Sequence, residues 1–258
     1  MYTILHNLLA DKKGGEIFVL FGAWHFAYIV LTLATVVTVL LLLKNRSDEV
    51  KNKVRKTFVC IAFGLYIADF FLMPLSYGYI NIEKLPFHAC TTMCVLCFLS
   101  EFVPFLKKCR LSFVFLGLIS NFVYLIYPAG VMWYEVHPLS YRVIQTLLFH
   151  SVMAVYGALT LILERNQISM NSWRRDLAVV VGLTLWALLG NYSYNGDSEG
   201  YSHFFNWFFV VQDPFNMFPE RIAPFIMPFL NISLFFAAEM LLHLILWWVK
   251  GMERGRLH

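Results

Sequence analysis

Residues 17–43, IFVLFGAWHFAYIVLTLATVVTVLLLL, form a long apolar run that is followed directly by the charged segment 44–56, KNRSDEVKNKVRK. A helix needs about 20 apolar residues to cross the hydrocarbon core of a bilayer. The run is longer than the core of a signal peptide and lacks a small-residue cleavage site, so we expect it to be retained. The two segments together predict a membrane span that ends at a basic aqueous face.

The composition of the whole chain is typical of a membrane protein. Of its 258 residues, 59% are hydrophobic and 14% are charged, whereas soluble domains are usually about a quarter charged. The net charge of +4 comes from short basic segments between apolar runs, which topology explains better than nucleic-acid binding does. We therefore expect membrane lipids as partners and no nucleic acid.

Six further apolar segments are long enough to cross a bilayer. Backbone polar groups in hydrocarbon must be satisfied within the segment, so each of them should be a helix. The predicted spans are 17–43, 57–80, 85–106, 110–133, 143–163, 173–194 and 223–249. The sequence thus predicts an all-α, polytopic membrane protein with seven transmembrane helices, which form a single domain over residues 1–258 without internal repeats.

The distribution of charge predicts the orientation of these helices. The links 44–56 and 107–110 and the tail 250–258 are basic, whereas 81–84 and 195–222 contain few positive residues. The positive-inside rule then places the N-terminus outside or in the lumen and the C-terminus in the cytoplasm. The membrane would be the cell membrane of a bacterium, or the endoplasmic reticulum or Golgi of a eukaryote.

The segment 195–222 is dense in aromatic residues, which favour the membrane–water interface. One interpretation is an interfacial or re-entrant segment that lies over the outer end of the bundle. The other is an amphipathic piece that only anchors in the lipid headgroups. The sequence leaves both open.

Polar side chains from five predicted helices reach the outer half of the membrane. A helix rises 1.5 Å per residue, which places His25, His88 and His150 roughly 12, 5 and 10 Å below the outer surface. The same level is reached by Asn191, Tyr192, Tyr194 and Asn231. Unpaired polar groups in hydrocarbon are costly, so we expect the three histidines to share a partly hydrated cavity.

The intramembrane charges are expected to be neutral or paired. Asp69, halfway along the second predicted helix, should be protonated or matched by a partner such as Asn121 or one of the histidines. Glu239 and His243 are spaced i, i+4 and can pair with each other. The predicted members of a structural cluster in the inner half are Glu101, Lys107, Glu239 and His243.

Three of the five cysteines, Cys90, Cys94 and Cys97, fall on one stripe of the third predicted helix. A Cys-x-x-Cys pair can bind zinc, but a second ligand pair at suitable spacing is absent. We therefore expect these cysteines to be packing residues, with neither a metal site nor a disulfide framework.

Acyl transfer needs a nucleophile beside a base. Cys90 is shallow enough to meet His25 or His150 across helices. Thr91, one turn below His88, is a competing nucleophile.

Four motifs carry a resemblance to a known family: Trp24-His25, LPFHACT at 85–91, LFHSVMAVYG at 148–157 and QDPFNMFPERI at 212–222. In this order they span the chain and resemble the bacterial YwaF-type membrane proteins. They also resemble the eukaryotic relatives of these proteins, the transmembrane-protein-164 acyltransferase family.

This resemblance implies acyl transfer or hydrolysis on lipids, particularly phospholipid remodelling, with His88 and His150 in catalytic roles and no cofactor. The eukaryotic members carry a cysteine directly before the third-helix histidine, where this chain has Phe87. Either Cys90 or Thr91 then serves as nucleophile, or the histidines act on a lipid hydroxyl directly, or the chain is not an acyltransferase.

The predicted substrate-binding residues are His25, Asn191, Tyr192, Asp213 and Asn231. An alternative function is a small-molecule or proton-coupled transporter or binding protein that uses the same cavity, with Asp69 and His150 as coupling residues. Against it, the chain lacks the inverted repeat of many transporters. A retinal protein is disfavoured, because the seventh predicted helix has no lysine before Lys250.

Overall fold

The structure is a computed structural model that describes residues 15–77, 82–128, 131, 135–194, 206–214 and 216–255. Parts of the predicted spans 57–80 and 110–133 and of the segment 195–222 lie outside these residues. Within the described part of the chain the secondary structure is entirely helical.

Each of the seven predicted segments contains a helix. The long helices are α2 Ala23–Leu43, α3 Asp48–Tyr77, α4 Ala89–Phe102, α6 Arg110–Ile126, α8 Tyr141–Leu163, α9 Trp173–Ser193 and α10 Ala223–Gly255. The short ones are η1 Ile82–Lys84, α5 Pro104–Lys107, η2 Arg165–Gln167, η3 Met170–Ser172 and η4 Trp207–Phe209. The predicted all-α class is therefore confirmed.

Four helical segments are long and apolar enough to cross a membrane: Ala23–Leu43, Tyr141–Leu163, Met170–Ser193 and Ala223–Val249. The helices α4 and α6 are apolar but shorter. These lengths fit a multi-pass membrane protein. The number of seven spans and the orientation of the termini stay predictions.

The largest differences from the predicted helix starts are those of α2 and α3. α2 begins at Ala23, because Phe21 adopts a positive φ of 57° and Gly22 is the extended N-cap. His25 consequently lies in the first helical turn. α3 begins at Asp48, so that Arg55 is part of a helix and not of a solvated link.

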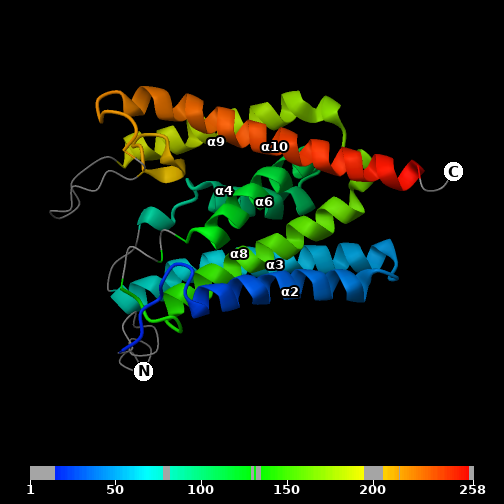
Figure 1. Cartoon of the computed structure of the whole chain (residues 1–258), viewed down its shortest axis with the longest axis horizontal. Helices are drawn as coiled ribbons and strands as arrows, with labels where there is room; N and C mark the ends of the chain where they lie inside the picture. The colour runs from blue at the N-terminus through cyan, green and yellow to red at the C-terminus, as the bar shows by residue number, and fades with distance from the viewer. Residues whose placement is uncertain are drawn as a thin grey trace.

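Figure 1 shows α4 and α6 between two groups of helices, α9 with α10 on one side and α2, α3 and α8 on the other. The long helices run alternately up and down the bundle. We call the end at which α4 begins the histidine end, because His88 precedes this helix. The opposite end, where α6 begins with Arg110, is the arginine end.

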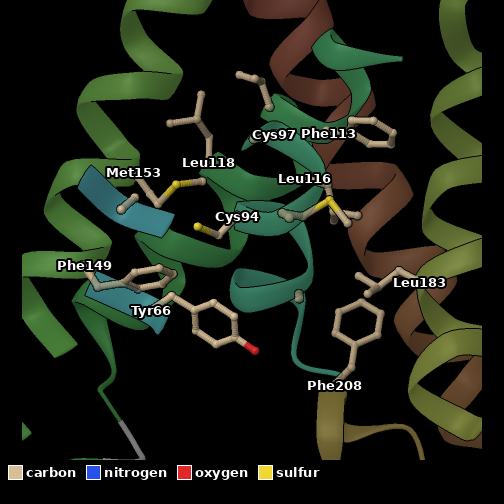
Figure 2. Close-up of a cluster of buried hydrophobic side chains, with 14 of the residues drawn as sticks. Tyr66, Cys94, Cys97, Phe113, Leu116, Leu118, Phe149, Met153, Leu183 and Phe208 are labelled. Atoms are coloured by element: carbon tan, nitrogen blue, oxygen red, sulfur yellow. The ribbon is translucent and has the colours of Figure 1, made fainter. Parts of the chain in front are cut away.

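The core of the bundle is formed by side chains from α3, α4, α6, α8 and α9. Figure 2 shows Cys94 on α4 directed into this core, close to Tyr66 and Met153. Cys94 and Cys97 are fully buried, and thiols pack there as small apolar groups. The predicted packing role of both cysteines is confirmed.

The outer surface of the bundle is apolar. α2 exposes Leu31 and Leu42 to more than half of their full area, and α10 exposes Phe225 and Phe229 to 72% each. Soluble proteins rarely expose contiguous apolar surfaces of this extent. A hydrocarbon environment accounts for them.

Gly190 allows close packing between α9 and the residue that precedes His88. A Cβ atom at Gly190 would lie 2.5 Å from the ring of Phe87, whereas a Cβ at Gly64 would meet nothing within 4 Å. We expect Gly190→Ala to destabilise the protein by roughly 1–3 kcal/mol through overpacking. Gly64→Ala should be neutral or stabilising, since alanine favours helix. Reversible unfolding of both variants in mixed micelles measures the difference, and equal effects would contradict this packing.

Candidate functional site

His25 joins α2 to the end of α6. Its Nδ1 accepts a hydrogen bond from the Phe21 amide (3.0 Å), and its Nε2 donates to the carbonyl oxygen of Leu125 (2.8 Å). A neutral imidazole that accepts at Nδ1 carries its proton on Nε2. Main-chain groups therefore occupy both ring nitrogens, which gives His25 a structural function. Its role in substrate binding stays a prediction.

His150 is a buried residue of α8 whose ring is oriented by Asn121 of α6. Its Nδ1 lies 2.6 Å from Oδ1 of Asn121, and Nδ2 of the same amide donates to the carbonyl oxygen of Gly117 (2.6 Å). The amide oxygen therefore faces the imidazole, so Nδ1 carries the proton and Nε2 keeps its lone pair. The ring also stacks on Tyr124, with centroids 4.1 Å apart. This arrangement is that of an oriented base.

His88, the half-buried N-cap residue of α4, has the opposite proton arrangement. The amide of Phe208 donates to its Nδ1 at 3.4 Å, which leaves the proton of the neutral ring on Nε2. Among the described residues, Nε2 of neither His88 nor His150 has a hydrogen-bond partner. The two rings are close enough to interact electrostatically. One end of the bundle thus holds both a base and an N–H donor.

Asp69 is paired, but not with the partners that the sequence suggested. Nζ of Lys84 lies 2.7 Å from one carboxylate oxygen, and the hydroxyl of Tyr141 donates to the other at 3.1 Å. The prediction that Asp69 has a partner is confirmed, but the suggested partners, Asn121 and the histidines, are wrong. Asn121 is occupied by His150, and the lysine of the short link after α3 reaches the carboxylate.

Lys84 brings a positive charge to the histidine end. Its carbonyl oxygen accepts a hydrogen bond from the hydroxyl of Tyr66 (2.9 Å), which fixes η1 beside α3. Its ammonium group interacts electrostatically with both His88 and His150. Sequence reasoning treated Lys84 only as a loop charge. Its ion pair with Asp69 and its proximity to the two imidazoles could not be read from the sequence of a short link.

The aromatic segment around η4 is inserted into the bundle. Trp207 and Phe208 are 1% and 2% exposed, respectively. The amide of Asn191 bonds both main-chain groups of Trp207, at 2.9 and 3.1 Å, and Asn231 donates to the carbonyl oxygen of Phe209 at 2.7 Å. Asn191 and Asn231, two of the predicted substrate-binding residues, thus form hydrogen bonds with main-chain groups of η4. The residues 195–205 and 215 of this predicted interfacial segment lie outside the described part of the chain.

The backbone of η4 adopts an unfavourable conformation. Phe208 and Phe209 have φ values of 58° and 52°, a region that costs non-glycine residues of the order of 1–3 kcal/mol each. Hydrogen bonds from α4, α9 and α10 all converge on these residues and their neighbour Trp207. They hold the segment against that cost and fix Phe208 over His88.

Asn191 should therefore control the local opening of η4. Replacing Asn191 by alanine removes two hydrogen bonds, each worth about 1 kcal/mol, so the amide of Trp207 should exchange its hydrogen roughly 10- to 30-fold faster. Tyr192→Ala is the matched control, because this neighbouring side chain is 60% exposed. Hydrogen exchange followed by mass spectrometry measures both variants, and an unchanged rate in Asn191→Ala would show that the amide does not hold the segment.

Phe87 cannot supply a nucleophile and serves as a packing residue. Its ring lies 4.8 Å from that of Trp186 and 4.9 Å from that of Trp207, measured between centroids. Cys90, the first proposed substitute, is half-buried and lies within electrostatic range of Lys84. Thr91 donates its hydroxyl to the carbonyl oxygen of His88 at 3.1 Å. Neither side chain is hydrogen-bonded to His150 within the described residues, so their catalytic roles stay predictions.

Two further predicted substrate-binding residues lie at the margin of this region. Tyr192 is exposed at the end of α9. Asp213 is buried after η4, where Oδ2 accepts a hydrogen bond from the amide of Phe218 at 2.8 Å. Asp213 thus closes a turn before α10. Ligand binding by either residue stays a prediction.

The predicted pairing of Glu239 with His243 is wrong. Nε2 of His243 lies 3.1 Å from Oδ2 of Asp176 on α9, whereas both carboxylate oxygens of Glu239 lack a partner among the described residues. Glu101 is not in contact with these residues either, since it binds Arg55 and Arg110. The helix α9 offers His243 a carboxylate with better geometry than a neighbour one turn away.

A groove of about 400 Å³ begins beside the histidine end, between α4, α6 and α9. Apolar side chains dominate its walls, among them Met93, Leu96 and Leu183. Pro86 also lines the groove, and its carbonyl oxygen accepts hydrogen bonds from the indole of Trp186 and the hydroxyl of Thr92, each at 2.6 Å. An apolar groove therefore includes a residue two positions before His88.

Comparison with known proteins identifies the family of this chain. The sequence model of the TMEM164 family matches residues 20–249, which include all seven long helices except the last residues of α10. The chain belongs to the TMEM164 family. No curated protein and no solved structure matches it.

Membership of the TMEM164 family confirms the resemblance inferred from the four sequence motifs. The matched region contains both histidines, the Asp69–Lys84 pair and the groove. This TMEM164-family chain is thus a multi-pass membrane protein, and Asp69, Lys84, His88 and His150 lie at its histidine end.

Proposed function

We propose that this chain is a membrane enzyme that transfers acyl groups between lipids, or hydrolyses them, with His150 as general base and His88 as hydrogen-bond donor. The observation that carries the proposal is the opposite proton arrangement of the two rings. His150 directs a lone pair, and His88 an N–H, from nitrogens without a partner among the described residues. Ester chemistry requires both groups, a base for the attacking hydroxyl and a donor for the carbonyl oxygen.

The reaction would proceed without a covalent intermediate on the protein. Nε2 of His150 takes the proton of a lipid hydroxyl or of water, and the oxygen attacks the ester carbonyl. The carbonyl oxygen becomes an oxyanion, which accepts a hydrogen bond from Nε2 of His88 and is favoured by the charge of Lys84. The tetrahedral intermediate then collapses, the acyl–oxygen bond breaks, and His150 returns its proton to the leaving alkoxide.

The electrostatics of the site support this assignment. Lys84 lies within electrostatic range of both imidazoles, so its positive charge is available to an oxyanion that develops between them. The carboxylate of Asp69 holds the lysine in place at 2.7 Å. Preorganised charge in an apolar surrounding stabilises a developing oxyanion better than water does.

The groove supports lipids as the substrate class. An acyl chain that lies in it contacts Met93 and Leu96 and has its ester near Pro86, beside His88. Burial of each methylene group contributes about 0.8 kcal/mol when the alternative is water. An ester at the mouth of the groove is then delivered to the histidines with its chain already bound.

If the groove binds the acyl chain, its size should determine which acyl-chain lengths the enzyme prefers. A Cβ at Gly182 meets nothing within 4 Å, and Gly182 lines the groove, so a larger side chain fills it without disturbing the helix. We expect Gly182→Leu to shift the preference of the enzyme toward shorter acyl chains and to leave kcat for these nearly unchanged. Gly64→Leu, on α3 away from the groove, is the matched control. Competition between labelled lipids of different chain length measures the preference.

The proposal itself is tested with purified protein in nanodiscs that contain a phospholipid with an isotope-labelled acyl chain and an unlabelled lysophospholipid. Mass spectrometry should find the labelled chain on the acceptor, or as free acid if water is the acceptor. His137→Ala, a loop histidine whose Nδ1 accepts from the amide of Leu139, should remain active. Absence of labelled product in every lipid combination would overturn the proposal.

A transporter is the second candidate, and the Asp69–Lys84 ion pair beside His88 and His150 favours it. Such a chain of titratable groups can carry protons. Uptake of a small molecule into proteoliposomes that follows a pH gradient, without any change in the lipids, would support transport in place of catalysis.

A further inference from the structure

The arginine end contains a second polar site, far along α4 from the histidines. Arg55 of α3 and Arg110 of α6 each bind both Glu101 and Glu164. All four side chains are at most 6% exposed. Tyr156 donates to the remaining oxygen of Glu101 at 3.0 Å. Two arginines and two carboxylates thus form a closed network that joins four helices.

This network leaves two hydrogen-bond donors without acceptors. Arg55 and Arg110 use only their terminal nitrogens, and the Nε–H groups of both are buried without a partner among the described residues. A buried N–H group without an acceptor is unfavourable. The charges of the two arginines and the two carboxylates therefore balance, but two hydrogen-bond donors of the network lack acceptors.

A cavity of about 260 Å³ lies against the same arginines. Besides Arg55, Arg110 and Glu101, its walls include Asn52, Lys56 and Lys107. Both lysines are exposed, and neither forms an ion pair within the described residues. Four cationic side chains thus face one carboxylate around a space that holds several water molecules at about 30 Å³ each.

We propose that this cavity binds a phosphate group. A phosphate offers acceptor oxygens to the guanidinium and ammonium groups that line the cavity, and arginine is the side chain that best matches its geometry. Lys56 and Lys107 add compact charges from the side of the solvent, and Asn52 adds an amide donor. The phosphate belongs either to a lipid headgroup at this end of the bundle or to a soluble phosphate compound. The site is separate from the histidine end and does not depend on the proposed reaction.

The test compares two double variants of the full-length protein. Lys56→Gln with Lys107→Gln removes the free charges of the cavity, and Lys53→Gln with Lys108→Gln removes two exposed lysines that do not line it. In detergent, inorganic phosphate at constant ionic strength should raise the thermal midpoint of the wild type and of the control by a few degrees. The cavity variant should bind phosphate at least about ten-fold more weakly, because it has lost two of the four cationic groups.

A second arm identifies the source of the phosphate. The same three proteins are placed in phosphatidylcholine nanodiscs with or without phosphatidic acid. If phosphatidic acid stabilises the wild type and the control but not the cavity variant, the ligand is a lipid headgroup. If the proteins respond to inorganic phosphate but not to phosphatidic acid, the ligand is a soluble phosphate compound. No response to either probe, or an equal loss in both double variants, would overturn the proposal.

Discussion

Replacing His150 by alanine should lower kcat for acyl transfer by about 10²–10⁴-fold, the usual contribution of a general base. KM should change little, because the groove that binds the acyl chain lies along α4 and α9 and does not include α8. The measurement is steady-state transfer of a labelled acyl chain in nanodiscs. A variant that keeps more than about a tenth of the wild-type kcat would exclude His150 as the base.

Asn121 provides the comparison that separates chemistry from folding. Its amide oxygen fixes the proton of His150 on Nδ1 at 2.6 Å, so Asn121→Ala should also lower kcat, by less than His150→Ala, with KM unchanged. Asn121→Asp keeps an acceptor at this position and should recover part of the activity. A purely structural role for Asn121 would instead lower the folded fraction and leave kcat per folded molecule as it was.

Replacing Glu101 by glutamine should be among the most destabilising single changes in the bundle. The substitution leaves Arg55 and Arg110 with one carboxylate between them in a buried position. Breaking a buried ion pair by removing one partner typically costs 3–5 kcal/mol, because a charge remains without compensation. We expect a decrease of about 3–5 kcal/mol in the free energy of unfolding, measured by reversible denaturation in mixed micelles.

The control for Glu101→Gln is an ion pair at the surface of the same helix bundle. Lys51 and Asp48 lie 3.5 Å apart at the start of α3, with Asp48 83% exposed. Exposed pairs contribute at most about 1 kcal/mol, so Asp48→Asn should have little effect on unfolding. If Glu101→Gln proved equally mild, water would have to reach the network and screen its charges.

The apolar runs predicted the positions of the long helices, because hydrophobic length is a property of each segment alone. The cysteine stripe on α4 was also predictable, since a spacing of four and three residues puts Cys90, Cys94 and Cys97 on one face. In both cases the information is local. Neither inference depends on which helices pack against each other.

The partners of the charged residues were not predictable in the same way. Arg55 was treated as part of a solvated link, because the apolar run of the second helix starts at residue 57. The helix α3 starts earlier, at Asp48, and turns this arginine toward Glu101. Likewise, His243 contacts Asp176 on α9 and not Glu239, its neighbour on α10. Such pairings depend on the arrangement of helices, which no single segment encodes.

At the histidine end, some features were predictable from the sequence and others were not. Depth along the helices placed His25, His88 and His150 in the outer half of the membrane. The structure brings His88 and His150 within electrostatic range, whereas His25 binds main-chain groups. The decisive details came from other residues, because Asn121 and Phe208 set which nitrogen of each ring carries the proton. Those partners lie 29 and 120 positions away in the sequence.

Nitrogen-15 NMR of histidine-labelled protein in nanodiscs tests the catalytic assignment most directly, with His88→Ala and His150→Ala used to assign the signals. The chemical shifts of the two ring nitrogens distinguish a protonated from an unprotonated nitrogen. We predict that neutral His150 carries its proton on Nδ1 and neutral His88 on Nε2. If His150 were protonated on Nε2, or if both rings shared the same tautomer, the pairing of a base with a donor at this site would be contradicted.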